Sequence, residues 1–180
     1  MKRAASKLAL GGAILLGLFS GPSLGQAAKM EPNLTKLLGQ AAAYQAKGQV
    51  NQAEKVLKQA LGQAQQPDEE LEAYRKAIEI APKYAEAWYN LGVAQARLEQ
   101  DAEAIHAYKQ ALILSPKFAK AWFNLGVLQG KLGNPQEKLR SYRRAVEADH
   151  NFGEAWHNLG VMFNAFGKAE EGRDAFDRAR

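Results

Sequence analysis

The chain has 180 residues, a length that predicts one domain. It contains no cysteine, which excludes a disulfide framework and a thiolate metal site. Its formal net charge is +5, from 24 Lys and Arg against 19 Asp and Glu, but three of the basic residues lie in the first 28 positions, which hold no acid. The remaining 21 basic residues are nearly balanced by the 19 acidic ones. The charge therefore gives no indication of a nucleic-acid partner.

The first 28 residues have the pattern of a secretory signal. A basic start is followed by an apolar run over residues 8–19, a Gly-Pro break at 21–22 and small residues over 25–28. The run is much shorter than the roughly 20 residues that span a bilayer. The basic residues are Lys2, Arg3 and Lys7.

We expect cleavage after Ala27 or Ala28, which leaves a mature chain outside the cytoplasm. The expected destination is the periplasm or an equivalent extracytoplasmic compartment, with release into the medium as second choice. The alternative is an uncleaved anchor, and only then would the protein contact a membrane. The absence of cysteine is compatible with an oxidising compartment.

Three helical segments are predicted before residue 85. The first covers about 34–47, which is rich in helix-forming residues. The others cover about 51–61, where apolar residues recur at spacings of three and four, and 68–82, whose apolar residues lie on one side of a helix. Residues 29–67 are interpreted as an N-terminal helical hairpin and 68–84 as a single helix. Alternatively, the helix over 68–84 is the second half of a repeat over 51–84.

A 34-residue unit over 85–118 then repeats over 119–152 and, shortened, over 153–180. Each copy predicts two helices separated by a short turn. The chain has no run of alternating β-branched residues, so an all-α protein with about nine helices is expected. The first helices should cover about 85–98, 119–132 and 153–166, and the second helices about 101–114, 135–148 and 169–180.

These copies resemble the tetratricopeptide repeat family, whose pattern is W-x2-L-G, then a small residue, an aromatic, a small residue and Pro. The resemblance is strong over 68–180 and weak over 34–67, and it implies a right-handed α-solenoid of antiparallel helix pairs. The matching residues are Trp88, Leu91, Gly92, Ala104, Tyr108, Ala111 and Pro116, then Trp122, Leu125, Gly126, Tyr142 and Ala145, then Trp156, Leu159, Gly160, Phe176 and Ala179.

The second and third units depart from the pattern in ways that affect stability and association. Lys138 and Gly172 stand where the family has Ala, and His150 replaces the Pro. The third unit ends at Arg180 without a polar capping helix, which terminal repeats normally need. We therefore expect the apolar side of the last helix, with Phe176, to be partly exposed and available to a partner or to a second copy of the chain.

No constellation of catalytic residues is present, and we predict that the protein is not an enzyme. The three histidines, His106, His150 and His157, lie in different units without metal-ligand spacing, so no metal or other cofactor is expected. A basic cluster has two interpretations. It is a solvated helix face, which is favoured, or a patch for an acidic partner or anionic lipid. Its members are Lys131, Lys138, Arg140, Arg143 and Arg144.

The family resemblance implies a concave groove, lined by the first helix of each unit, that binds a peptide or a partner protein. Asn recurs at one position of every unit, although it is a mediocre residue inside a helix. Its amide could hydrogen-bond an extended peptide, as in the asparagine ladder of O-linked sugar transferases, or it could bond within the repeats. Both interpretations stay open. The predicted groove residues are Tyr89, Asn90, Val93, Arg97, Phe123, Asn124, Val127, Lys131, His157, Asn158 and Val161.

Valine and aromatic residues favour an apolar segment, extended or helical, over capture of a peptide carboxyl terminus. The family's carboxylate-clamp version has Lys and Asn where Tyr89 and Val93 stand. The first functional hypothesis is thus a non-enzymatic interaction module, exported, that acts as scaffold or assembly factor for a protein or peptide partner. The alternative is a structural protein that self-associates through its last helix.

Overall fold

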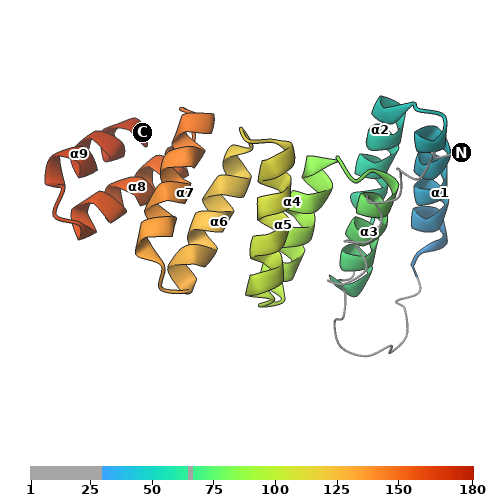
Figure 1. Ribbon diagram of the computed structural model, residues 1–180, viewed down its shortest axis with the longest axis horizontal. Coiled ribbons are helices and arrows are strands. Elements are labelled where there is room, and N and C mark those ends of the chain that lie inside the picture. The colour runs from blue at the N-terminus through green and yellow to red at the C-terminus, as the bar shows by residue number, and fades with distance from the viewer. Residues whose placement is uncertain (1–29, 65–66) are drawn as a thin grey trace, which may run out of the picture.

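The computed structural model describes residues 30–64 and 67–180, so the expected signal over 1–28 lies outside the described residues. Within these ranges the protein consists of nine α-helices and no strand, which confirms the all-α prediction (Figure 1). Predicted and observed helix ends differ by two residues at most. The helices are α1 (Pro32–Ala46), α2 (Val50–Leu61), α3 (Pro67–Ile80), α4 (Ala85–Arg97), α5 (Asp101–Leu114), α6 (Ala119–Lys131), α7 (Pro135–Ala148), α8 (Gly153–Ala165) and α9 (Ala169–Arg178).

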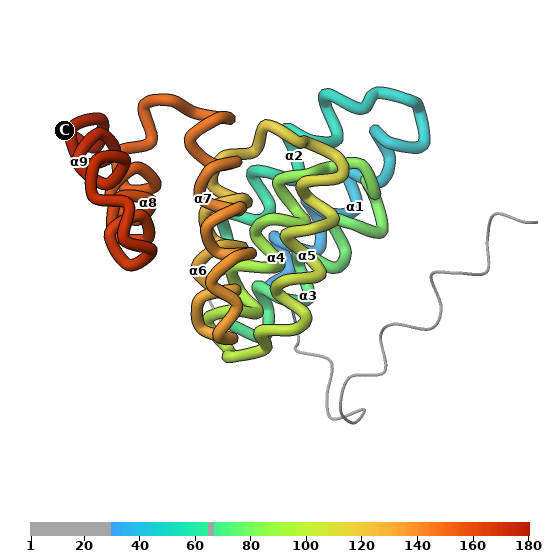
Figure 2. The backbone as a smooth tube through the Cα atoms, turned by 60° about the vertical axis from the view of Figure 1, so that its left-hand side comes forward, coloured from blue at the N-terminus to red at the C-terminus, as the bar shows by residue number. Residues whose placement is uncertain are grey.

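The helices form a solenoid in which neighbours in sequence are neighbours in space (Figures 1 and 2). Each repeat is one closely packed pair, α4 with α5, α6 with α7 and α8 with α9, and the second helix of each pair packs on the first helix of the next. The helices α1 and α2 form a further pair. The helix α3 has no such partner: it packs mainly on α4 and only lightly on α1 and α2. None of the helices described is long and apolar enough to cross a membrane.

A glycine in the first helix of each repeat sets the distance to the second helix. A Cβ atom added to Gly92 would lie 2.7 Å from the ring of Tyr108, closer than side chains tolerate. The same holds for the pairs Gly126–Tyr142 and Gly160–Phe176, where the added atom would lie 2.8 Å from the ring. The family signature Gly and the aromatic of the second helix are therefore two halves of one contact.

At a second contact between the paired helices, the larger side chain lies on different helices in different repeats. In the second repeat, the stem of Lys138 covers Gly130, whose added Cβ would lie 2.8 Å from the Lys138 Cδ. In the third repeat the large residue is on the other helix, because Asn164 fills the space that a side chain on Gly172 would need. The corresponding residues of the first repeat are Ala96 and Ala104, which belong to one apolar cluster. Both departures from the family pattern are thus compensated on the facing helix: Gly130 makes room for Lys138, and Asn164 fills the space beside Gly172.

A tryptophan in each repeat closes the turn that precedes it. The indole Nε1–H of Trp122 donates to the carbonyl of Pro116 at 2.8 Å. Trp88 donates in the same way to Pro82 at 3.0 Å, and Trp156 to His150 at 2.8 Å. Because the acceptor is a backbone carbonyl, His150 replaces the family's Pro without loss of this bond.

The N-terminal pair is tied to the rest of the chain through α3. The backbone N–H of Glu31, at the start of α1, donates to the Glu69 carboxylate of α3 at 2.7 Å. Glu69 is only 6% exposed. A carboxylate beside the free N–H groups of a helix N-terminus is stabilised by the helix dipole. This part-buried contact holds the start of α1 against α3.

The last helix carries charge where earlier second helices are apolar. Leu112 of α5 and Val146 of α7 are buried against the following repeat, and the equivalent position after α9 is Arg180. Phe176 is half-buried, with its ring centroid 5.3 Å from that of His157. Phe176 is thus partly exposed, as the sequence predicts, but Arg180 makes the stacking surface of the third repeat less apolar than that of the first two.

Four helix ends share one turn geometry. After α1, α4, α6 and α8, one residue adopts a positive φ, and the N–H of the next residue bonds back to the carbonyl five positions earlier at 2.9 to 3.0 Å. Glycine occupies the positive-φ position in three of the turns, with φ between 70° and 74°. The fourth turn has Glu99 at φ 58°. Residues other than glycine are strained at a positive φ.

Substitution Glu99→Gly should raise the free energy of unfolding by about 1 kcal/mol, because it removes this strain while keeping the turn. Urea denaturation followed by circular dichroism measures the change. The matched control is Gly133→Ala in the equivalent turn, which should lower stability by a similar amount. Equal stability of all three proteins would contradict this assignment.

Candidate functional site

All the predicted groove residues lie on the first helices of the three repeats. We call the surface that they form the A face, which is defined by the corresponding stripes of α4, α6 and α8. Its residues are Tyr89, Asn90, Val93 and Arg97 on α4, Phe123, Asn124, Val127 and Lys131 on α6, and His157, Asn158 and Val161 on α8.

Valine at one repeated position supplies the apolar surface of the A face. Val127 is 44% exposed and Val161 is 48% exposed. Val93 is more covered, and it packs against the core of its own repeat. Exposed branched apolar side chains at equivalent positions of successive repeats form a line that water solvates poorly. This line is the exposed apolar part of the A face.

Two of the three residues that directly precede the asparagines are covered by packing against other rings of the solenoid. The ring of Tyr89 lies 4.7 Å from that of Phe118, centroid to centroid. Phe123 is 7% exposed and stacks on Tyr142 at 5.5 Å. Only His157 at this position is well exposed. Of the three variable residues, His157 is therefore the one with most surface available to a ligand.

Two of the three asparagines lie against tyrosines of the preceding repeat. The Asn124 amide donates to the Tyr89 hydroxyl at 3.2 Å and lies near the hydroxyl of Tyr108. Asn158 lies near the hydroxyl of Tyr142. In both cases the amide joins a repeat to the tyrosine of the preceding one. This role explains why Asn recurs at a position where helix propensity disfavours it.

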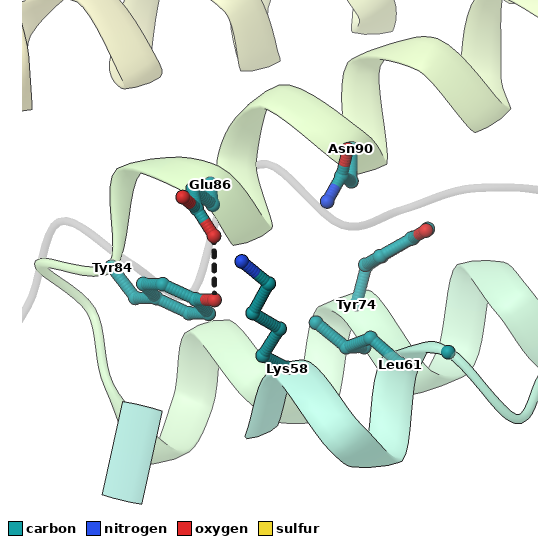
Figure 3. Close-up of a pocket in the computed structure, with 7 residues that line it drawn as sticks. Lys58, Leu61, Tyr74, Tyr84, Glu86 and Asn90 are labelled. Carbon is teal, nitrogen blue, oxygen red and sulfur yellow. Dashed lines mark hydrogen bonds between the residues drawn. The ribbon is translucent and has the colours of Figure 1, made fainter. Parts of the chain in front are cut away.

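Asn90 is the exception. The hydroxyl of Tyr74, in the preceding helix, instead donates to the Glu70 carboxylate at 3.1 Å. No hydrogen bond joins the Asn90 side chain to another residue of 30–64 or 67–180, and it faces a hollow between α2, α3 and α4 (Figure 3). The repeat pattern predicts Asn90 as a groove residue but gives no indication of Lys58, Tyr84 or Glu86, which line the same hollow. The irregular junction around α3 brings them together, and no repeat pattern marks it.

The two predicted groove cations bridge repeats. Arg97 of α4 pairs with Glu70 of α3, and Lys131 of α6 pairs with Asp101 of α5 at 2.7 Å. Each pair joins a first helix to the helix before it. Exposed pairs of this kind contribute little stability, but they hold the charges in place.

The basic cluster is largely satisfied within the chain. Arg140 pairs with Glu137 at 3.2 Å, and Arg144 pairs with Glu147 at 3.2 Å. The Arg143 guanidinium lies 5.3 Å from the centre of the Phe163 ring. These contacts favour the interpretation of the cluster as a solvated helix face. In the described part of the chain, no group of three or more acidic or histidine side chains is close enough to hold a metal ion.

Burial controls the ionisation of the tyrosines that pack between helices. It raises the pKa of Tyr108 to about 12, although the Asn124 hydrogen bond acts in the opposite direction. The pKa of Tyr74 is also raised to about 12, by burial first and then by the charge and hydrogen bond of Glu70. Both folded values lie above the pKa of about 10 of an unfolded tyrosine.

The folded state should therefore lose stability as the pH rises from about 10 to 12. Above the unfolded pKa, the unfolded chain releases tyrosine protons that the folded chain still holds. Urea midpoints between pH 8 and 12, combined with tyrosine absorbance at 295 nm, measure this change. A midpoint that stays constant to pH 12, or tyrosines that all titrate near pH 10, would contradict the assignment.

Comparison with protein families identifies the repeats. Five models described as tetratricopeptide or TPR repeats match residues 37–71, 63–99, 85–118, 107–140 and 124–180. Residues 37–180 are tetratricopeptide repeats. The models extend the resemblance into the N-terminal region, where the sequence motifs are weak. No curated protein matches the sequence at a significant level.

Solved structures of MamA share the fold. A crystal structure of MamA superposes with a TM-score of 0.59 at 22% identity, covering 82% of this chain and 76% of the other. A second MamA structure gives 0.59 at 23% identity, with 81% and 89% covered. MamA from Desulfovibrio magneticus gives 0.57 at 16% identity, with 83% and 94% covered. At these identities the likeness shows the fold alone.

Proposed function

We propose that this protein is a non-enzymatic interaction module that binds an extended or helical segment of a partner protein along the A face. In this role it acts as a scaffold or assembly factor. The observation that carries the proposal is the exposure of Val127 and Val161 at equivalent positions of adjacent repeats. The tetratricopeptide repeats support it, because such solenoids present extended surfaces for binding.

A comparison of the first and second helices supports the choice of the A face. On the second helices, the charged residues of α7 pair with each other or cover aromatic rings. On the A face, the valines have no such cover. Burying apolar surface is the main favourable term in association, at roughly 25 cal/mol for each Å². A partner segment with apolar residues at matching intervals would bury this surface.

Self-association through the last helix is less well supported. It needs an apolar stacking face on α9, and the charge of Arg180 at the position of Leu112 and Val146 opposes it. A second copy docked there would leave this charge poorly solvated. A separate partner on the A face therefore remains the first choice.

The proposed module is exported, on the basis of the signal pattern in residues 1–28. N-terminal sequencing of the protein recovered from an extracytoplasmic fraction should give a chain that begins after Ala27 or Ala28. An intact Met1 in the cytoplasmic fraction would contradict export, and an intact Met1 in the membrane fraction would indicate the uncleaved anchor.

The double substitution Val127→Asp and Val161→Asp should weaken peptide binding at least tenfold, because it places charge on the apolar line. Peptides selected from a display library on the wild-type protein serve as ligands, and fluorescence anisotropy gives their affinities. The matched control is Ile113→Asp on α5, since Ile113 is also exposed, at 69%, but lies outside the A face. Unchanged binding by the double variant, with an intact fold, would contradict the proposal.

A further inference from the structure

A hollow of about 220 Å³ lies between α2, α3 and α4 (Figure 3). Its walls include Leu61 at the end of α2, Tyr74 of α3, and Glu86 and Asn90 of α4. Lys58 of α2 extends its ammonium into the space between Glu86 and Asn90 (Figure 3). A space of this size is below that of drug-sized sites and suits a single side chain.

Three of the five polar side chains that line the hollow are already bonded. The Tyr84 hydroxyl donates to the Glu86 Oε2 at 2.8 Å, and the Tyr74 hydroxyl donates to Glu70 at 3.1 Å. The Glu86 carboxylate is thus held toward Tyr84, on the far side of Lys58 from Asn90 (Figure 3).

The other two polar groups have no such bond. Neither the Lys58 ammonium nor the Asn90 amide forms an ion pair or hydrogen bond with the residues of 30–64 and 67–180. Asn124 and Asn158, by contrast, are engaged with tyrosines of the preceding repeat. The junction around α3 therefore leaves one asparagine of the series free and places a cation beside it.

We propose that this hollow binds a carboxylate from an acidic side chain of the partner segment. The Lys58 ammonium supplies donors only, and Asn90 turns the NH2 of its amide, not its oxygen, toward the hollow (Figure 3), so the missing partner is an acceptor, best matched by a negatively charged one. The walls formed by Leu61 and Tyr74 exclude part of the solvent, which strengthens the pairing. This inference rests on the proposed function, since Asn90 belongs to the A face.

The surroundings favour a side chain over a chain terminus. A second hollow, of about 430 Å³, shares Tyr84 and Glu86 with the first and continues toward Lys117 and Phe118. A partner segment can therefore pass the carboxylate site and continue along the surface. An acidic residue within such a segment would insert its side chain while the backbone runs on.

The test is nuclear magnetic resonance of the 15N-labelled protein, with the side-chain amide signals of Asn90 as readout. Three probes are compared. N-acetylglutamate α-methylamide carries only a side-chain carboxylate, the glutamine analogue is neutral, and N-acetylglycine carries only a terminal carboxylate. The first probe should shift the Asn90 signals in a saturable way, at least fivefold more tightly than the other two, while the Asn124 signals stay in place.

Variants assign the effect to the hollow. Lys58→Gln should weaken binding of the glutamate probe at least fivefold, whereas Lys55→Gln, on the same helix but outside the hollow, should leave it unchanged. Glu86→Gln should tighten binding, because it removes the opposing charge. The inference is overturned if the neutral or terminal probe binds as well as the glutamate probe, if Lys58→Gln has no effect, or if no shift is seen.

The two proposals fail in different ways. Loss of the glutamate effect, with peptide binding still sensitive to Val127→Asp and Val161→Asp, would remove only the carboxylate site. Peptide binding insensitive to the valine substitutions, with the Asn90 shifts intact, would instead remove the A face as the binding surface and leave the hollow as a separate site.

Discussion

The close contact between a glycine and an aromatic ring within each helix pair is the constraint on which the structure depends. It brings Gly92 against Tyr108, and the same approach recurs in the next two repeats. Because the rings fill the space between paired helices, the hydroxyl groups of Tyr108 and Tyr142 reach the next repeat and lie near Asn124 and Asn158. The spacing of the A face, and hence of its exposed valines, follows from this contact.

The junction around α3, where the solenoid is irregular, also contains polar side chains without a hydrogen-bond partner in the described part of the chain. The helix α3 packs like the second helix of a repeat against α4, but α2 pairs with α1 instead of with α3. The resulting junction leaves a hollow and frees Asn90 from the role that its counterparts have. In the regular repeats Asn124 and Asn158 lie against tyrosine hydroxyl groups, whereas at the break Asn90 and Lys58 have no such partner among the described residues.

Sequence periodicity predicts the helices well because the apolar stripe and the Trp, Leu, Gly and aromatic positions repeat in register. It could not predict that Gly172 makes room for Asn164, since that compensation joins two residues with no fixed pattern between them. The same limit applied to the candidate site. Asn90, Asn124 and Asn158 look identical in sequence, and only their tyrosine neighbours distinguish them. Lys58 lies in a degenerate unit, and no motif in the sequence marks it as a site residue.

The central claim is that the first helices, and not the second helices, receive the partner. Site-specific photo-crosslinking in cells that produce the protein tests it most directly, with a photoreactive residue placed either at Val127 of α6 or at Arg144 of α7. The account predicts a discrete cross-linked product from position 127 and none from position 144. A product from position 144 alone would contradict it and would move the binding surface to the opposite helices.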